Sequence, residues 1–290
     1  MNESTLNKDI DKNILRIRSI CYESTKKCNL NCEYCIASDN EYYSKDDDYG
    51  KIIKFMAEIN PERIVISGGE PLLDTNLVDK LSMIRNSCIN SYISLSTNGS
   101  LKYELDNLKG LIDCIDISLP TLNPKLYALM RGKNLVDIVK TTIKNAIAML
   151  FNVRISIVLS KVNVSDLMNI LEYANKVGVN SVRIGRFLPF RNAACVKNKY
   201  ELSDDAIKKT MEEVKRVKFN FNIIPPILDL SIMEAGYINV NYLGEVFLPT
   251  SKGKVICGNT SDANKNMWEK IAEVQKSIFL NMEEKSGIKK

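Results

Sequence analysis

The stretch "ILRIRSICYES", residues 14–24, is followed three residues later by "CNLNCEYC", residues 28–35. The first stretch is apolar and β-branched enough to form a buried strand. The second places Cys28, Cys32 and Cys35 within eight residues, in a chain that contains no histidine. We interpret the pair as a strand that leads into a metal-binding loop.

The same alternation continues along the chain. Amphipathic stretches follow apolar runs, which favours parallel βα units with right-handed crossovers. We therefore predict an α/β fold, a partial (β/α)6 TIM-like barrel. The later strands are expected at 63–67, 91–97, 114–119, 153–160 and 181–188, and the helices at 49–59, 76–86, 101–109, 134–150 and 165–177. Polar motifs follow the first three strands, at the barrel end where active sites gather.

The pattern changes near residue 200. A capped helix is expected at 203–217, a strand at 219–225, a hairpin at 237–248 turning at Leu243-Gly244, and a last helix at 264–284. We predict a core barrel over 1–200. Residues 201–290 are expected to form a short α+β C-terminal extension that closes the open side of the barrel.

Composition restricts the class of protein. The chain has 290 residues, of which 45% are hydrophobic, enough for one large core. Its 40 basic and 35 acidic residues give a net charge of only +5, which argues against a nucleic-acid partner. No apolar run or N-terminal signal indicates a membrane, so a cytoplasmic protein is expected. Eight cysteines, three of them clustered, favour metal ligation over disulfides.

Three clustered thiolates allow two kinds of metal site. Structural zinc usually takes four ligands, often as two separated pairs, and no second C-x2-C occurs here. A [4Fe–4S] cluster is usually held by four thiolates, so three would leave one iron open to another ligand. The residues by themselves leave both sites possible.

Two further motifs lie after the next strands: "SGGEPLL" at 67–73 and "STNGS" at 96–100. Together with the cysteine loop they resemble the radical S-adenosylmethionine (SAM) superfamily, most closely the molybdenum-cofactor cyclase and peptide-modifying branches. This resemblance implies that Cys28, Cys32 and Cys35 hold one [4Fe–4S] cluster per chain. SAM would bind its fourth iron.

The resemblance also implies a set of SAM contacts. They comprise the glycine turn, polar strand-end residues, a strand arginine and apolar walls for the adenine: Tyr34, Gly68, Gly69, Glu70, Ser96, Asn98, Ser118, Arg154 and Leu188. Structural alternatives exist, since glycines and asparagines also make turns and Glu70 could cap the following helix. A bulky residue at Gly69 is expected to weaken SAM binding and leave the cluster intact.

The implied activity is reductive cleavage of SAM to a 5′-deoxyadenosyl radical, which abstracts a hydrogen from a substrate. A small biosynthetic molecule is favoured (a sugar, nucleoside or amino-acid derivative), with flavodoxin or ferredoxin as electron donor. The alternatives are a peptide-modifying enzyme and a non-catalytic metal-binding scaffold. Three arginines near the sixth strand are interpreted as surface residues rather than substrate contacts: Arg183, Arg186 and Arg191.

The tail resembles that of relatives with auxiliary iron–sulfur clusters but keeps one cysteine, Cys257, in "VICGN". A lone cysteine is commonly a small buried hydrophobe. The functional alternative is a catalytic role for Cys257, as the thiol that donates a hydrogen atom to a substrate radical in an epimerase.

Overall fold

The computed structural model describes residues 17–37, 49–228, 236–250 and 253–286. One sheet joins all its described strands in the order β10-β9-β8-β1-β2-β3-β4-β5-β6-β7. They are β1 (Ser19–Glu23), β2 (Arg63–Ser67), β3 (Tyr92–Thr97), β4 (Cys114–Ser118), β5 (Val153–Leu159), β6 (Ser181–Arg186), β7 (Asn222–Ile224), β8 (Tyr237–Asn241), β9 (Glu245–Thr250) and β10 (Gly253–Asn259). The strands from β8 through β1 to β7 are parallel, which confirms the predicted α/β barrel class.

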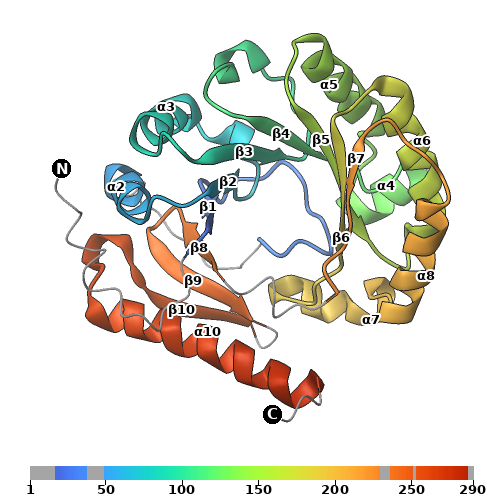
Figure 1. Cartoon of the computed structure of the whole chain (residues 1–290). Coiled ribbons are helices and arrows are strands. Elements are labelled where there is room, and N and C mark those ends of the chain that lie inside the picture. Colours follow the sequence, from blue (N-terminus) through green and yellow to red (C-terminus); the bar gives the residue numbers. More distant parts are fainter. Residues whose placement is uncertain (1–16, 38–48, 229–235, 251–252, 287–290) are drawn as a thin grey trace.

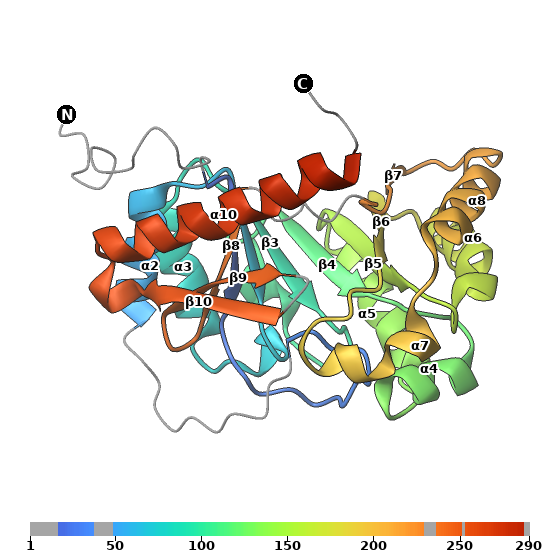
Figure 2. The ribbon, with the colours of Figure 1, turned by 90° about the horizontal axis from the view of Figure 1, so that it is seen from below.

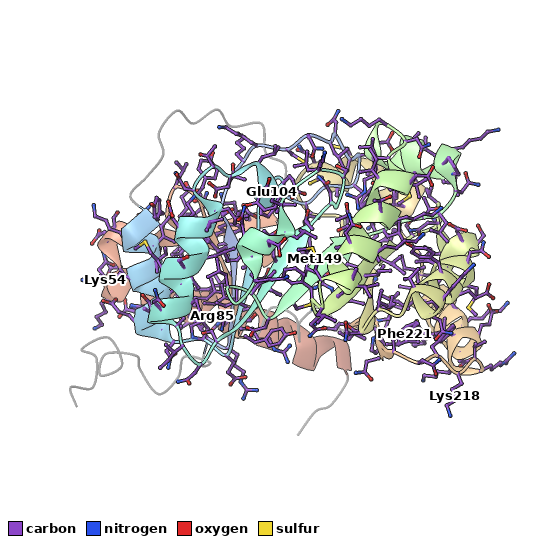
Figure 3. All side chains as sticks on the ribbon, turned by 90° about the horizontal axis from the view of Figure 1, so that it is seen from above. Lys54, Arg85, Glu104, Met149, Lys218 and Phe221 are labelled. Carbon is purple, nitrogen blue, oxygen red and sulfur yellow. The ribbon has the colours of Figure 1, made fainter. Side chains whose placement is uncertain are left out.

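Helices cover the outside of this curved sheet, as Figure 1 shows. They are α2 (Tyr49–Ile59), α3 (Leu77–Ser87), α4 (Pro124–Arg131), α5 (Val136–Ala148), α6 (Leu167–Val177), α7 (Lys197–Tyr200), α8 (Asp204–Lys215) and α10 (Lys265–Ser286). In Figure 3 the side chains of Lys54 in α2 and Arg85 in α3 lie on this helix-covered side. In the described part of the chain, no helix is long and apolar enough to cross a membrane.

Alternation along the strands gives the sheet an apolar outer face and a polar inner face. Isoleucines of the central strands, such as Ile64, Ile115 and Ile155, are fully buried in the main core with residues of the covering helices. Successive side chains point to opposite faces. The neighbours of these isoleucines, including Asp116 and Arg154, therefore face the inside of the barrel.

The region after residue 200 extends the same sheet in both directions. Strand β7 pairs with β6, and β8 pairs in parallel with β1 before turning into the antiparallel β9 and β10. Helix α10 lies along the outside of β9 and β10 (Figure 2), and its Trp268 stacks on Phe55 of α2 at 5.8 Å. The sheet thus runs through the predicted boundary at residue 200, and the division into two domains stays a prediction.

Two local expectations were wrong. The segment 101–109 forms only a short 3-10 helix, Leu105–Leu108, instead of an α-helix. Conversely, α4 was not expected, although its ends carry clear signals. Asn123 accepts hydrogen bonds from the first-turn amides, Pro124 occupies the first helical position, and Gly132 ends the helix at φ +85°. With only eight residues, α4 is too short for apolar periodicity to reveal it.

Candidate functional site

The cysteine loop follows β1 and crosses one end of the barrel (Figures 1 and 2). Cys28 is exposed, whereas Cys32 and Cys35 are partly buried. Burial raises the pKa of Cys32, the nearby Arg131 opposes that rise, and the other two thiols add to it. The three thiols therefore lie within electrostatic reach of one another. No three Cys, His, Asp or Glu side chains in the described ranges converge closely enough to hold a single metal ion.

Several buried donor atoms lie beside these thiols without an acceptor. The Nε of Arg131 and the hydroxyls of Tyr34 and Tyr127 are buried and have no hydrogen-bond partner. A [4Fe–4S] cluster takes thiolates from several sides and offers sulfur acceptors and negative charge to such donors. The residues of this loop and its surroundings therefore fit a cluster.

The glycine turn after β2 packs directly on the cysteine loop. A Cβ on Gly69 would lie 2.3 Å from the Lys27 oxygen, and a Cβ on Gly68 would lie 2.4 Å from the Thr25 oxygen. The Gly69 amide donates to the Thr25 oxygen at 2.8 Å, and the Glu70 amide donates to the Lys27 oxygen at 2.7 Å. Because the contact is with the loop that carries Cys28, this packing argues against the expectation that a bulky residue at Gly69 spares the cluster, which stays a prediction.

Glu70 joins the turn to the end of β3. Its carboxylate is fully buried and accepts from the Thr97 hydroxyl at 2.7 Å, the Asn98 amide at 2.7 Å and the Leu72 amide at 3.1 Å. Burial raises the pKa of this carboxyl, and the three hydrogen bonds act in the opposite direction. Glu70 does cap the 3-10 helix Pro71–Leu73, as the structural alternative expected, and it also fixes the "STNGS" segment.

The "STNGS" segment is bonded to the cysteine loop through side-chain amides. Asn98 Nδ2 donates to Asn29 Oδ1 at 2.9 Å, and Asn29 Nδ2 donates to Ser100 Oγ at 2.9 Å. Ser96 and Ser118 are partly buried near the carboxyl ends of β3 and β4. The predicted polar contacts thus lie at the end of the barrel that carries the cysteine loop, and their contact with SAM stays a prediction.

Arg154 lies elsewhere. It is the second residue of β5, paired in register with Ser181, and its Nε donates to the Ser181 hydroxyl at 3.3 Å. Its Nη1 is 3.6 Å from Asp116 Oδ2. The carboxyl end of β5, Leu159, is five residues further, roughly 16 Å along the strand. This placement argues against the predicted contact between Arg154 and SAM.

The predicted apolar walls meet near the cysteine loop. Tyr34 is buried in a small cluster with Met130, Phe187 and Tyr200, against which Cys32 packs. The Tyr34 and Phe187 rings lie 5.4 and 5.7 Å from the Tyr200 ring. Leu188 follows Phe187 directly and is partly buried, so an apolar surface does border the loop.

Cys257 lies near the carboxyl end of β10 but belongs to the core on the outer side of the sheet. It lies at a bulge in β10, between Ile256 and Gly258, and is buried in the main core together with Trp268 of α10. Burial raises the pKa of its thiol to about 11. Because α10 covers the outside of the sheet, the thiol points away from the barrel interior. This position argues against the predicted hydrogen-donor role.

Residues that sequence reasoning missed lie on α4 and on the inner face. Arg131 ends α4 beside Cys32, and the helix caps at Asn123 and Gly132 could have revealed it. Arg183, interpreted as a surface residue, lies on the inner face with its Nη2 2.8 Å from Asp116 Oδ2.

The other two arginines near the sixth strand, Arg186 and Arg191, are considered separately from Arg183. Arg186 is only 12% exposed and pairs with Asp204 at 3.0 Å, and its Nη1 donates to the Leu228 oxygen at 2.9 Å. The side chain of Arg191 lies outside the described residues.

Residues 22–174 match the family described as the Radical SAM superfamily. The chain belongs to the radical SAM superfamily. This family uses a [4Fe–4S] cluster together with SAM, and the matched range includes the cysteine loop, the glycine turn and the end of β3.

The chain is also similar to individual members of the superfamily. It is 34% identical over 209 residues to a protein named probable GTP 3′,8-cyclase from Methanococcus aeolicus, covering 69% of this chain and 67% of the relative. A protein of the same name from Methanocaldococcus jannaschii is 34% identical over 62% of each chain. The chain thus spans only about three fifths to two thirds of the length of these relatives.

Solved structures share the fold at low identity. SuiB of Streptococcus suis bound to S-adenosylmethionine has a TM-score of 0.74 at 15% identity, covering 94% of this chain and 70% of SuiB. The structure described as native anSMEcpe with bound AdoMet has a TM-score of 0.69 at 18% identity, covering 90% and 83% of the two chains. Both confirm the barrel architecture.

Proposed function

We propose that this radical SAM enzyme acts on a small molecule with an anionic group, which binds on the inner face of the barrel at Arg183. The supporting observation is the geometry of this side chain. Its Nη2 is 2.8 Å from Asp116 Oδ2, and its Nε donates to the Ser156 hydroxyl at 3.0 Å, yet 42% of the side chain stays exposed. A guanidinium fixed on one edge and open elsewhere is pre-organised for carboxylate or phosphate.

The cysteine-loop end of the barrel is proposed to hold the cofactors. When bound there, the cluster and SAM supply the 5′-deoxyadenosyl radical that abstracts a hydrogen atom. The chain would hold the cluster through Cys28, Cys32 and Cys35. Glu70 and Asn98 fix the glycine turn and the third strand end against that loop. We further propose flavodoxin or ferredoxin as the electron donor, and the cytoplasmic location stays a prediction.

The names of the relatives favour a nucleotide or nucleoside among small molecules. Those relatives are probable GTP 3′,8-cyclases, and the present chain matches about two thirds or less of their length. One solved neighbour is described as bound to precursor peptide SuiA, but at 15% identity it supports the fold alone. The burial of Cys257 on the outer side of the sheet argues against the peptide-epimerase alternative, in which this thiol would donate the hydrogen atom.

The test begins with anaerobically reconstituted protein, SAM and dithionite, assayed for 5′-deoxyadenosine. A panel of nucleoside triphosphates, sugar phosphates and their neutral counterparts is then added, and we expect anionic members to accelerate its formation. Arg183→Gln should raise the KM for the active compound roughly tenfold or more, since a charge-assisted hydrogen bond contributes about 1.5–3 kcal/mol.

Arg186→Gln is the matched control, because the Arg186 guanidinium is already occupied by Asp204 and the Leu228 oxygen. The KM of this variant should equal that of the wild type. Equal responses to anionic and neutral compounds, or an unchanged KM in Arg183→Gln, would refute the proposed substrate class.

A further inference from the structure

The carboxyl end of α4 lies against the cysteine loop. Gly132, which ends the helix at φ +85°, is so close that a Cβ there would be 3.7 Å from the backbone oxygen of Asn31. Asn31 directly precedes Cys32 in the loop. The preceding residue, Arg131, is thereby placed at the loop, and a cation is also favoured at the carboxyl end of a helix.

Arg131 is a buried cation at this contact. Its side chain is mostly buried (8% exposed), and its guanidinium carbon lies 5.8 Å from the centre of the Tyr34 ring. The guanidinium lies within electrostatic reach of the Cys32 thiol and opposes the rise in its pKa. Among the described residues, it forms no ion pair with a carboxylate, although it opposes the rise that burial causes in the pKa of the Glu70 carboxyl. A buried cation without a paired anion is strongly disfavoured, so this position needs negative charge beside it.

Three donors converge there without acceptors. The Nε of Arg131, the hydroxyl of Tyr34 and the hydroxyl of Tyr127 are all buried without partners. Tyr127 is fully buried, and both tyrosines lie within electrostatic reach of Arg131 and Cys32. Buried donors of this kind are normally satisfied. Sulfur atoms of an anionic group held by Cys32 would provide both the missing acceptors and the missing charge.

We propose that Arg131 is a positioning residue for the iron–sulfur cluster, donating to the Cys32 sulfur and, through Nε, to a second sulfur of the bound cluster. This inference rests on the proposed cluster site in the cysteine loop. Tyr34 and Tyr127 add hydroxyl donors on the same side. Positive charge and hydrogen bonds to the sulfurs favour the reduced, more negative cluster, so Arg131 raises its reduction potential.

The test compares Arg131→Met and Arg131→Lys with the wild-type chain. Each is reconstituted anaerobically, its iron and sulfide content is measured, and its midpoint potential is determined by redox titration with electron paramagnetic resonance. Arg131→Met should lower the equilibrium constant for reduction about tenfold or more, a shift of about 59 mV or more to negative potential for one electron. Arg131→Lys keeps the charge and should recover part of the shift.

Arg85→Met is the matched control, because Arg85 pairs with Asp113 at 2.7 Å before β4, away from the cysteine loop, and its midpoint should equal that of the wild type. Tyr127→Phe removes only one hydroxyl, so its midpoint potential serves as the test if Arg131→Met takes up no cluster. It should load fully and show a smaller shift in the same direction.

If Arg131→Met takes up the cluster, an unchanged midpoint potential in that variant would overturn the inference. If it does not, unchanged midpoint potentials in both Tyr127→Phe and Arg131→Lys would overturn it. Absence of any iron–sulfur cluster from the wild-type chain would instead refute the proposed function itself.

Discussion

Replacement of Gly69 by alanine tests whether the glycine turn exists to seat the cysteine loop. The added Cβ would lie 2.3 Å from the Lys27 oxygen and 2.5 Å from the Lys26 oxygen, whereas ordinary contact begins at 3.4 Å. Since both atoms belong to the backbone, the turn and the loop would have to separate by about 1 Å (3.4 minus 2.3 Å).

The cost can be estimated from the contacts that this separation disturbs. Two backbone hydrogen bonds, from the Gly69 amide at 2.8 Å and from the Glu70 amide at 2.7 Å, join the turn to the loop. Losing both would cost about 1–3 kcal/mol at about 0.5–1.5 kcal/mol each. Overpacking adds about 1–3 kcal/mol. We expect Gly69→Ala to be destabilised by roughly 2–6 kcal/mol in total.

The assay measures iron and sulfide per chain after anaerobic reconstitution, together with urea unfolding of the chain before reconstitution. Because the loop ahead of Cys28 shifts, Gly69→Ala should lose most of its cluster. Gly178→Ala is the control. Gly178 ends α6 at φ +81°, and a Cβ there would have nothing within 4 Å, so that variant has only about 1–2 kcal/mol of backbone strain. Wild-type iron content in Gly69→Ala would refute this reasoning.

Three further outcomes follow from two other buried groups, Lys80 and Cys257. Lys80→Ala breaks an ion pair with Asp74 at 2.8 Å, whose side chains are 9% and 6% exposed, so unfolding in urea should show a loss of about 3–5 kcal/mol. The exposed control, Lys109→Ala, should stay within about 0.5 kcal/mol, and an equal loss in both variants would contradict the assignment. Cys257→Ala should cleave SAM and form product at the wild-type rate, and a stalled reaction would restore the donor hypothesis. Since burial raises the pKa of the Cys257 thiol to about 11, iodoacetamide at pH 8 should modify the exposed Cys195 well before Cys257, as peptide mass analysis would show.

The local pattern of the chain was sufficient for the order of elements. The strand at 63–67 and the helix at 49–59 were predicted with the bounds that the structure has, because each pairs a regular apolar pattern with a clear boundary. The cysteine loop and the glycine turn were also predicted to meet, since carboxyl ends of parallel strands lie at the same end of a barrel.

Tertiary structure decided which side chains contact one another across the barrel. From the alternating pattern, Arg154 was predicted to contact SAM and Arg183 to lie on the surface. In the structure both side chains reach Asp116 on the inner face, and Arg154 lies at the end of β5 away from the cysteine loop. The apolar residues next to Cys257 in the sequence would be the same whether its thiol faced the substrate or the covering helix. Only the packing of α10 on the outside of the sheet determines which.

The sequence by itself determined that a parallel α/β barrel presents three cysteines, a glycine turn and a polar third strand end on one side. Those features depend on spacing along the chain, which the letters record directly. Tertiary structure alone placed Arg131 beside Cys32, which is 99 positions away (131 minus 32). Contacts over that separation depend on how a short helix packs against a loop, and neither local propensity nor periodicity encodes that packing.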